Sequence, residues 1–279
     1  MRFTKMHGLG NDFIVVEAWQ DLPDGDLSAL ARQICQRRWG VGGDGLVFLL
    51  PSEVADLRMH IYNADGSVAE MCGNALRCVS QYVYEHGYCQ RPDLKVETLD
   101  GIKQVHLEIS DQQVKLVKVD MGLPILEPTR IPMLTLTDSP VEVPIEVLGE
   151  RYVVTGVAVG VPHAVVFVPD VNKVDVARVG ASLEQHPIFP RGANVDFVQV
   201  INSRRVMVRV WERGVGVTLA CGTGACAVVV AGVLNGLTDE QVDVELPGGT
   251  LQIYWQDRKR LYMTGPAKEV FTGKWPLVR

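Results

Sequence analysis

Two short cysteine-glycine segments, 149 residues apart (221 − 72), carry the strongest chemical signal in this sequence. They read MCGN at 71–74 and ACGT at 220–223, and each precedes a helix-like run. A thiol acts as a base only when it ionises, and the free N–H groups and dipole at a helix N-terminus lower the pKa of a cysteine. Two such thiols on opposite sides of one molecule could move a proton between the two faces of a carbon atom. Cys72 and Cys221 therefore indicate two-base proton transfer.

The elements that must position these cysteines also occur twice. Leu57–Asn63 and Val206–Glu212 have the same 149-residue offset, and both alternate apolar and polar residues as strands do. The runs at 74–84 and 225–234 have helical character, and the second is almost wholly apolar. The predicted N-cap residues are Asn74 and Thr223. A strand, a glycine-bearing loop and a cysteine-headed helix are thus expected in each half of the chain.

Short strands with period-two patterning dominate the rest of the sequence. This pattern favours an α+β fold with two mostly antiparallel lobes over a doubly wound parallel fold. A proline-bearing extended passage at 114–144 is the expected crossover between the halves. The other expected elements are strands at 13–18 and 46–50 and helices at 28–37 and 181–186.

Composition excludes several classes of protein. The 279 residues carry a net charge of −6 without a basic run, so nucleic acid is not an expected partner. The first twenty residues lack the apolar centre of a signal peptide, and the longest apolar stretch, 225–234, is shorter than the ~20 residues that span a membrane. We therefore expect a soluble cytoplasmic protein that does not bind membranes.

The six cysteines show no C-x-x-C pair and no histidines at zinc-like spacing, so no metal site is expected. In a reducing cytosol they should be free thiols. The four cysteines outside the repeated context are expected to be small apolar residues of the interior: Cys35, Cys78, Cys89 and Cys226.

Four motifs occur together and in order: HGLGNDF at 7–13, MCGNALRC at 71–78, WERGVGVTLACGTGAC at 211–226 and YMTGPA at 262–267. On these motifs the chain resembles the diaminopimelate epimerases, a family of cofactor-independent two-cysteine racemases. The resemblance runs from the first residues to the last turn.

The resemblance implies two pseudo-symmetric lobes, each with a mostly antiparallel sheet wrapped round a central helix. Residues 1–119 with 268–279 would form the lobe that carries Cys72, and residues 120–267 the lobe that carries Cys221. The active site would lie in the cleft between them, and the lobes would close over the substrate to exclude water. Like its relatives, the protein would be a homodimer.

The implied activity is the epimerisation of LL-2,6-diaminopimelate to the meso form without pyridoxal phosphate or another cofactor. This isomerase would feed lysine synthesis and, in bacteria, wall peptide assembly. Cys72 would donate and Cys221 accept a proton in one direction, with roles exchanged in the reverse direction. His163 and Glu212 match positions that tune the thiols. The residues implied in substrate binding are Asn11, Asn63, Gly73, Asn74, Asn194, Glu212, Arg213, Gly222 and Thr223.

Simpler interpretations remain open for some of these residues. On sequence alone, His163 equally fits a structural histidine after Pro162, and both Asn11 and Asn63 fit turn chemistry. Three positions depart from the usual family pattern: Val161 replaces an asparagine that contacts substrate, Val217 stands where many members carry glutamate, and Gly45 stands where some carry glutamine.

Two alternative functions follow. A racemase of the same fold could act on another amino acid, which Val161 favours mildly, while Asn63, Asn194 and Arg213 disfavour it. The paired thiols could instead serve redox chemistry, although no thioredoxin or peroxidase context accompanies them. A catalytically silent binding module would need a lost cysteine or a broken helix start, and the sequence shows neither.

Overall fold

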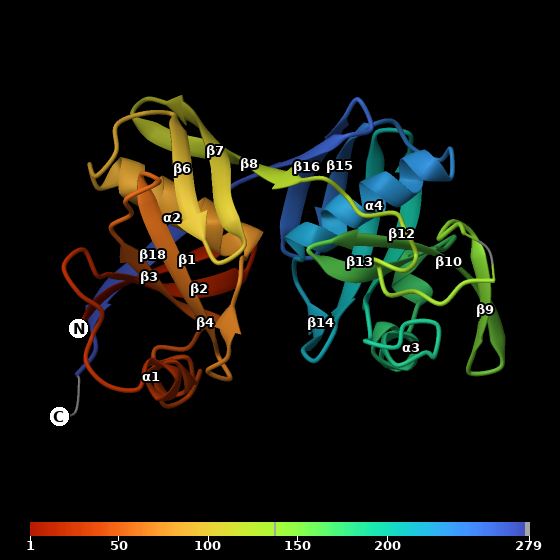
Figure 1. The fold of residues 1–279 in the computed structure, drawn as a ribbon, viewed down its shortest axis with the longest axis horizontal. Helices are drawn as coiled ribbons and strands as arrows, with labels where there is room; N and C mark the ends of the chain where they lie inside the picture. The colour runs from red at the N-terminus through yellow and green to blue at the C-terminus, as the bar shows by residue number, and fades with distance from the viewer. Residues whose placement is uncertain (137, 277–279) are drawn as a thin grey trace. The chain divides into compact units, whose positions relative to one another are not determined.

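The computed structural model describes residues 1–136 and 138–276. The chain forms two compact units, Met1–Asp120 with Thr264–Arg279 (unit 1) and Met121–Met263 (unit 2). The expected ranges were 1–119 with 268–279 and 120–267, and residues 277–279 lie outside the described part of the chain. In Figure 1 unit 1 runs from red to yellow and includes the blue strand β18, and unit 2 runs from green to blue.

Unit 1 contains two helices and a set of mostly antiparallel strands. Its elements are β1 (Arg2–Gly8), β2 (Asn11–Glu17), α1 (Leu27–Ile34), β3 (Gly45–Leu50), β4 (Leu57–Asn63), β5 (Val68–Ala69), α2 (Gly73–Glu85), β6 (Asp93–Thr98), β7 (Gly101–Ser110), β8 (Gln113–Gly122) and β18 (Lys268–Lys274). The pairs β2–β3 and β4–β6 are parallel, because α1 and α2 respectively connect their strands, and the other pairs are antiparallel.

Unit 2 repeats this order of elements and pairings. It contains β9 (Val143–Val147), β10 (Glu150–Val159), β11 (Val161–Phe167), the 3-10 turn η1 (Val171–Lys173), α3 (Val176–Glu184), β12 (Asn194–Asn202), β13 (Arg205–Glu212), β14 (Gly216–Thr218), α4 (Gly222–Leu234), β15 (Gln241–Leu246), β16 (Gly249–Gln256) and β17 (Arg260–Gly265). Here β11–β12 and β13–β15 are the parallel pairs, joined through α3 and α4. The predicted α+β class is confirmed.

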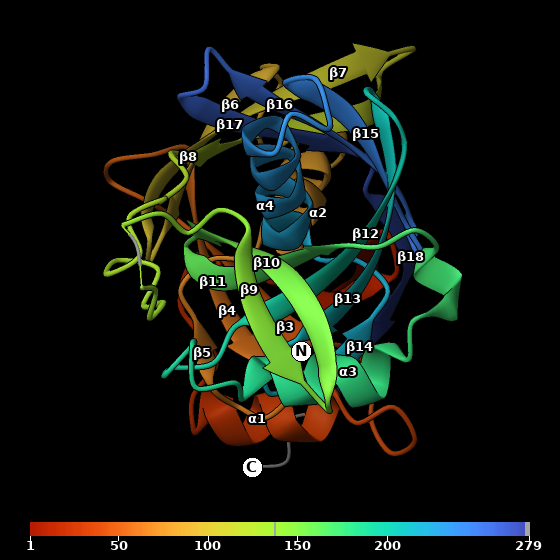
Figure 2. The same ribbon diagram turned by 90° about the vertical axis from the view of Figure 1, so that its right-hand side faces the viewer.

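A buried helix lies among the strands of each unit. In α2 every residue from Gly73 to Val83 is buried, including Arg77, whose Nε donates to the carbonyl oxygen of Pro266 at 3.2 Å. In α4 only Thr223 and Leu234 escape full burial, as the apolar run predicted. In Figure 2 the axis of α4 runs roughly vertically, and this helix contacts β10, β11, β12, β15 and β16.

Several expected elements differ from those observed. The helix expected at 28–37 ends at Ile34, after which the backbone turns through Gly40 and Gly42. The helix expected at 181–186 begins earlier, at Val176, because Asp175 caps it by accepting from the N–H of Arg178 at 3.1 Å. The strand expected at 13–18 is β2, and β1 before it was missed.

The crossover expected as extended chain over 114–144 is partly regular structure. β8 occupies its first part, and β9 begins near its end.

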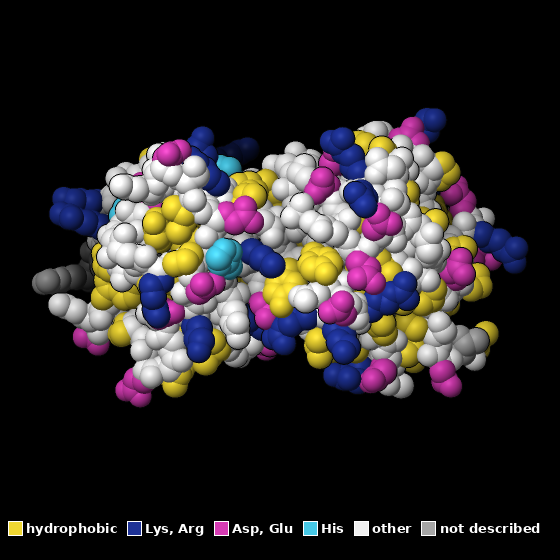
Figure 3. All heavy atoms as spheres, turned by 90° about the horizontal axis from the view of Figure 1, so that it is seen from above, with side chains coloured by type: hydrophobic (Ala, Val, Ile, Leu, Met, Phe, Trp, Pro, Cys, Tyr) yellow, Lys and Arg dark blue, Asp and Glu magenta, His cyan; other side chains and the backbone are white. Residues whose placement is uncertain are grey.

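Charge on the surface is mixed, as the sequence indicated: Figure 3 shows Lys and Arg side chains interspersed with Asp and Glu on the face that it presents. Among the helices of the described ranges, none has the length and apolar character needed to span a bilayer.

Candidate active site

Both cysteines are themselves the N-cap residues of the buried helices. Cys72 and Cys221 have extended backbones, with φ/ψ of −142°/117° and −123°/113°, immediately before the first residues of α2 and α4. The prediction that Asn74 and Thr223 cap these helices was wrong, because both lie inside the first turn. A cap residue needs the extended conformation that each cysteine has. Each thiol is therefore placed beside the free N–H groups of its helix.

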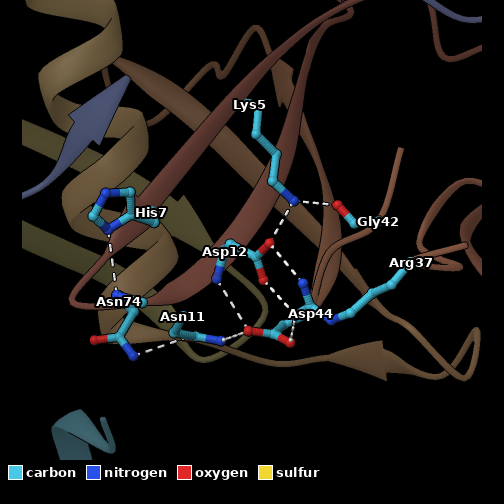
Figure 4. A network of polar contacts seen from close by, with 9 residues as sticks. Lys5, His7, Asn11, Asp12, Arg37, Gly42, Asp44 and Asn74 are labelled. Atoms are coloured by element: carbon cyan, nitrogen blue, oxygen red, sulfur yellow. Dashed lines mark hydrogen bonds and ion pairs between the residues drawn. The ribbon is translucent and has the colours of Figure 1, made fainter. Parts of the chain in front are cut away.

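In unit 1 the side chain of Asn11 connects Cys72 to α2. Its Oδ1 accepts a hydrogen bond from Asn74 Nδ2 at 2.9 Å and lies 3.9 Å from Cys72 Sγ. Its Nδ2 donates to Asp44 Oδ2 at 2.7 Å, so the two ends of the amide are assigned by their partners. Asn11 thus turns an acceptor toward the thiol. Figure 4 shows Asn11 between Asn74 and Asp44.

Asp44, the hydrogen-bond partner of Asn11, belongs to an ion cluster that sequence reasoning missed. Arg37 makes two hydrogen bonds to the carboxylate of Asp12, at 2.7 and 3.1 Å, and one to Asp44 at 2.7 Å. Lys5 forms an ion pair with Asp12 at 2.6 Å and also bonds to the carbonyl oxygen of Gly42. Burial works to raise the pKa of Asp12, but the hydrogen bonds from Arg37 and Lys5 outweigh it and lower the pKa to about 2. Figure 4 shows these groups, together with Asn11 and Asn74, as one network of polar contacts.

Asn63 ends β4 and forms a turn. Its Nδ2 donates to Ser67 Oγ at 2.9 Å, and its backbone N–H bonds to the Ser67 carbonyl oxygen. Its neighbour across the sheet is Gly45, where an added Cβ would lie 3.0 Å from the Tyr62 carbonyl oxygen and 3.3 Å from Phe13 Cδ1. A side chain at position 45 would require Tyr62 or Phe13 to shift by a few tenths of an ångström. The turn role of Asn63 is observed, and its substrate role stays a prediction.

In unit 2 the thiol of Cys221 is almost completely buried, with 5% of the residue exposed. Its Sγ accepts from the Gly224 N–H at 3.4 Å and lies 3.4 Å from Thr223 Oγ1. Burial raises the pKa of Cys221 well above its ordinary value, and the charges of Glu212 and Asp196 raise it further. For this thiol in the substrate-free protein, the predicted lowering of the pKa was wrong, since desolvation outweighs the helix start and both hydrogen bonds.

His163 lies next to this thiol in a polar chain. It is fully buried on β11, with Nδ1 2.8 Å from Asp196 Oδ2 and Nε2 3.0 Å from Thr223 Oγ1. Asn194 Nδ2 lies 3.4 Å from the same Nε2. The parallel register of β11 and β12 places His163 directly opposite Asn194, which explains how two distant residues meet. The structure thus gives His163 a polar environment directed at the start of α4.

Glu212 ends β13, and Arg213 follows it. The Arg213 N–H donates to Asn194 Oδ1 at 2.8 Å, and its Nη1 donates to the Arg191 carbonyl oxygen at 2.8 Å. Arg213 also lines a surface hollow of about 610 Å³. Glu212 Oε1 accepts from Thr218 Oγ1 at 2.6 Å, and the carboxylate is close enough to influence the pKa of Cys221.

The predicted site residues therefore gather within each unit. Unit 1 brings together Cys72, Gly73, Asn74 and Asn11. Unit 2 brings together Cys221, Gly222, Thr223, His163, Asn194, Glu212 and Arg213. Sequence reasoning missed Asp44 and Asp196. One available signal was that Asp196 follows Asn194 by two residues and so shares its strand face.

Two of the unusual residues lie at the surface near these groups. Val161 begins β11 opposite Val159, and Val217 in β14 is 48% exposed. Within residues 1–136 and 138–276, no group of three or more His, Cys, Asp or Glu side chains is arranged to hold a metal ion.

Comparison with known proteins identifies relatives along nearly the whole chain. The family model of diaminopimelate epimerase matches residues 3–127 and 155–270. The chain is 53% identical over 279 residues to the diaminopimelate epimerase of Moorella thermoacetica, covering 99% of this chain and 100% of the relative. It is 54% identical over 278 residues to that of Desulforudis audaxviator, covering 99% of both chains.

Solved structures share the fold at low sequence identity. A probable proline racemase from Agrobacterium radiobacter superposes with a TM-score of 0.74 at 16% identity, covering 99% of this chain and 93% of that one. A hydroxyproline epimerase from Agrobacterium vitis gives a TM-score of 0.71 at 18% identity, covering 98% and 90%. With two cysteine-capped buried helices and full-length relatives at about half identity, the chain belongs to the diaminopimelate epimerase family.

Proposed function

We propose that this chain is an isomerase that interconverts LL- and meso-2,6-diaminopimelate, an amino-acid epimerisation in lysine biosynthesis. Its full-length relatives carry that name, and the family assignment supports the same activity here. The structural observation that carries the proposal is the repeated cysteine cap: each unit places one thiol at the N-terminus of its buried helix. A reaction that removes a proton from one face of a carbon and returns one to the other requires two such groups.

The two thiols act as the two bases. The thiolate of one cysteine removes the α-proton, and the thiol of the other delivers a proton to the opposite face, so both Cys72 and Cys221 must reach the same α-carbon. The carbanion develops beside the substrate carboxylate, and the N–H groups at the helix starts can stabilise that charge. Those N–H groups belong to Gly73, Asn74, Gly222 and Thr223.

Protonation state decides which thiol is ready to act. The raised pKa of Cys221 keeps it as a thiol in the substrate-free protein, ready to donate a proton. In the direction in which Cys221 is the base, it must first lose its own proton. The imidazole of His163, connected to it through Thr223, is a buried group able to accept that proton.

The second amino-acid centre of the substrate needs its own contacts, because the enzyme must reject amino acids with a single centre. We assign this recognition to Asn11, Asn63, Asn194, Glu212 and Arg213. The guanidinium of Arg213 binds the distal carboxylate, and Glu212 the distal ammonium group. The hydrogen bond between Asn194 and the Arg213 backbone supports a shared position for two of these residues.

The proposal is tested by deuterium incorporation at the α-carbon in D2O, with reduced protein and without added pyridoxal phosphate. LL-diaminopimelate, lysine, histidine and proline are supplied separately. Exchange with inversion on diaminopimelate alone is the expected result. No exchange on any of the four would overturn the proposed activity.

The two-base mechanism is tested with serine variants of the cysteines. Cys72→Ser and Cys221→Ser are each expected to abolish epimerisation, whereas Cys89→Ser, a partly exposed cysteine elsewhere in unit 1, should retain it. Retention of one-sided proton exchange without inversion in either active-site variant is compatible with the mechanism. Unchanged turnover in Cys72→Ser or Cys221→Ser would refute the mechanism.

A second candidate function is racemisation of another amino acid. Val161 favours it, because an apolar side chain begins β11 where family members place an asparagine, and solved relatives of this fold include a probable proline racemase. Exchange on proline or histidine, with none on diaminopimelate, would select this alternative.

We also propose a homodimer located in the cytoplasm. Family membership supports both features. Sedimentation equilibrium on the purified protein tests the first, since a single species with the mass of one 30.7 kDa chain would contradict it. Fractionation of cells that express the protein tests the second.

A further inference from the structure

Asp196 is a fully buried carboxylate that the two-base mechanism leaves without a role. It lies on β12, and its Oδ2 is 2.8 Å from His163 Nδ1. Its Oδ1 has no hydrogen-bond partner among residues 1–136 and 138–276 and lies against Gly224, where an added Cβ would be only 2.4 Å away. Burying a carboxylate is costly unless a specific partner uses it. The partner here is the imidazole of His163.

The contacts of His163 fix which of its nitrogen atoms carries hydrogen. The Asp196 carboxylate only accepts, so Nδ1 donates to it and Nε2 of the neutral ring is an acceptor. A second observation gives the same tautomer. Asn194 Oδ1 accepts from the Arg213 N–H, which makes the other end of that amide, Nδ2, the donor facing Nε2. His163 is thereby prepared to accept a proton at Nε2.

The chain of donors continues to the cysteine. Thr223 Oγ1 lies 3.0 Å from His163 Nε2, closer than Asn194 Nδ2 at 3.4 Å, and its hydroxyl donates there. Its remaining lone pairs face Cys221 Sγ at 3.4 Å, within reach of an S–H donor. Hydrogen bonds therefore run in one direction, from Cys221 through Thr223 and His163 to Asp196.

We propose that Asp196 and Thr223 are positioning residues of a proton relay that ionises Cys221, an inference that rests on the proposed role of Cys221 as a base. The Cys221 S–H bond breaks as its proton passes to Thr223 Oγ1. The Thr223 hydroxyl proton passes to His163 Nε2 in the same step. The products are a thiolate at Cys221, an intact Thr223 hydroxyl, and an imidazolium whose Nδ1–H donates to the Asp196 carboxylate.

The relay lowers the electrostatic cost of forming a thiolate at Cys221. The titratable groups that face Cys221 are Glu212 on β13, Asp196 on β12 and, through Thr223, His163 on β11. Both carboxylates oppose a thiolate, so simple loss of the proton to water would add a third negative charge to a buried site. Transfer to His163 keeps the net charge of the site constant, and the imidazolium then lies between the thiolate and Asp196.

The test is the pH dependence of Cys221 alkylation by iodoacetamide, measured without substrate by mass spectrometry of its peptide, with Cys89 as the internal reference. The relay predicts that Asp196→Asn lowers the Cys221 alkylation rate at pH 7 by about tenfold or more, because a hydrogen bond to a charged group is lost. A role as a nearby negative charge predicts the opposite sign, since removing that charge favours the thiolate. An unchanged or increased rate overturns the proposal.

A second pair of variants tests the relay where Asp196→Asn fails to fold. Thr223→Val removes the hydroxyl and keeps the side-chain shape, and Thr223→Ser keeps the hydroxyl. We expect the alkylation rate at pH 7 to fall about tenfold in Thr223→Val and to be retained in Thr223→Ser. Equal rates in the two variants overturn the proposal. Because no substrate is present, failure of this test is distinct from failure of the exchange test on diaminopimelate.

Discussion

Gly224 lies in the first turn of α4, where a methyl group would collide with Asp196. In Gly224→Ala the new Cβ would be 2.4 Å from Asp196 Oδ1, and ordinary contact begins near 3.4 Å. The carboxylate must therefore move by ~1 Å, since the backbone of a buried helix cannot easily yield. Such a shift breaks or distorts its 2.8 Å hydrogen bond to His163.

The expected effects on stability and activity are of different size. Alanine favours the helix over glycine by ~1 kcal/mol, overpacking costs ~1–3 kcal/mol, and the lost hydrogen bond to a charged group costs ~1.5–3 kcal/mol. The free energy of unfolding should therefore fall by about 1.5–5 kcal/mol. The value of kcat should fall by ~10- to 100-fold, because a misplacement of ~1 Å at a catalytic group can have that effect.

Gly232→Ala in the same helix is the matched control. Its Cβ would lie 2.4 Å from Thr238 Oγ1, at the other end of α4 from His163. We expect a smaller fall in unfolding free energy, about 0–2 kcal/mol measured in urea, because only the overpacking and helix-propensity contributions apply. The kcat for deuterium exchange on saturating LL-diaminopimelate should stay within about twofold of that of the parent protein. Full kcat in Gly224→Ala, or an equal loss in both variants, would refute the reasoning.

Three further predictions concern acid stability, thiol reactivity and substrate affinity. The pKa of Asp12 is lowered to about 2, so its ionised carboxylate stabilises the fold above about pH 4, and this contribution is lost as pH falls towards 2. The free energy of unfolding in urea should therefore change less with pH in Asp12→Asn than in the parent protein. Identical pH dependence in the two proteins would contradict the ion-pair assignment. Burial raises the pKa of Cys35 and of Cys78 to about 12, so both should resist iodoacetamide at pH 8 until denaturant is added, as mass spectrometry would show. Arg213→Lys should raise KM for diaminopimelate by about tenfold and change kcat less, because bidentate carboxylate binding is lost; an unchanged KM would remove Arg213 from the substrate site.

The sequence was sufficient to predict the repeated unit that positions the chemistry. The 149-residue offset placed two strands and two helices correctly, since alternation and helical spacing are local properties of the chain. The apolar run at 225–234 also predicted that α4 is buried on every side. Exact helix limits were less predictable, because side-chain caps such as that of Asp175 decide where a helix begins.

The electrostatics of the site could not be predicted from local patterns. Asp196 and His163 are 33 residues apart and meet only because two parallel strands align them in register. Likewise, a helix start by itself favours a thiolate, but the pKa of Cys221 depends on how deeply the residue is buried and on carboxylates from other strands. These properties arise from tertiary contacts that no short segment encodes.

The pairing of β1 with β18 has a consequence for synthesis on the ribosome. Arg2 lies opposite Lys274 and His7 opposite Lys268, and the Met1 ammonium group donates to the Trp275 carbonyl oxygen at 2.8 Å. The hydrogen bonds between β1 and β18 can therefore form only after β18 has been synthesised and has left the ribosome. Unit 2 is continuous from Met121 to Met263, so all of its residues leave the exit tunnel before unit 1 has its final strand. Although domains generally fold in order from the N-terminus during translation, here the first domain to begin is the last to be finished.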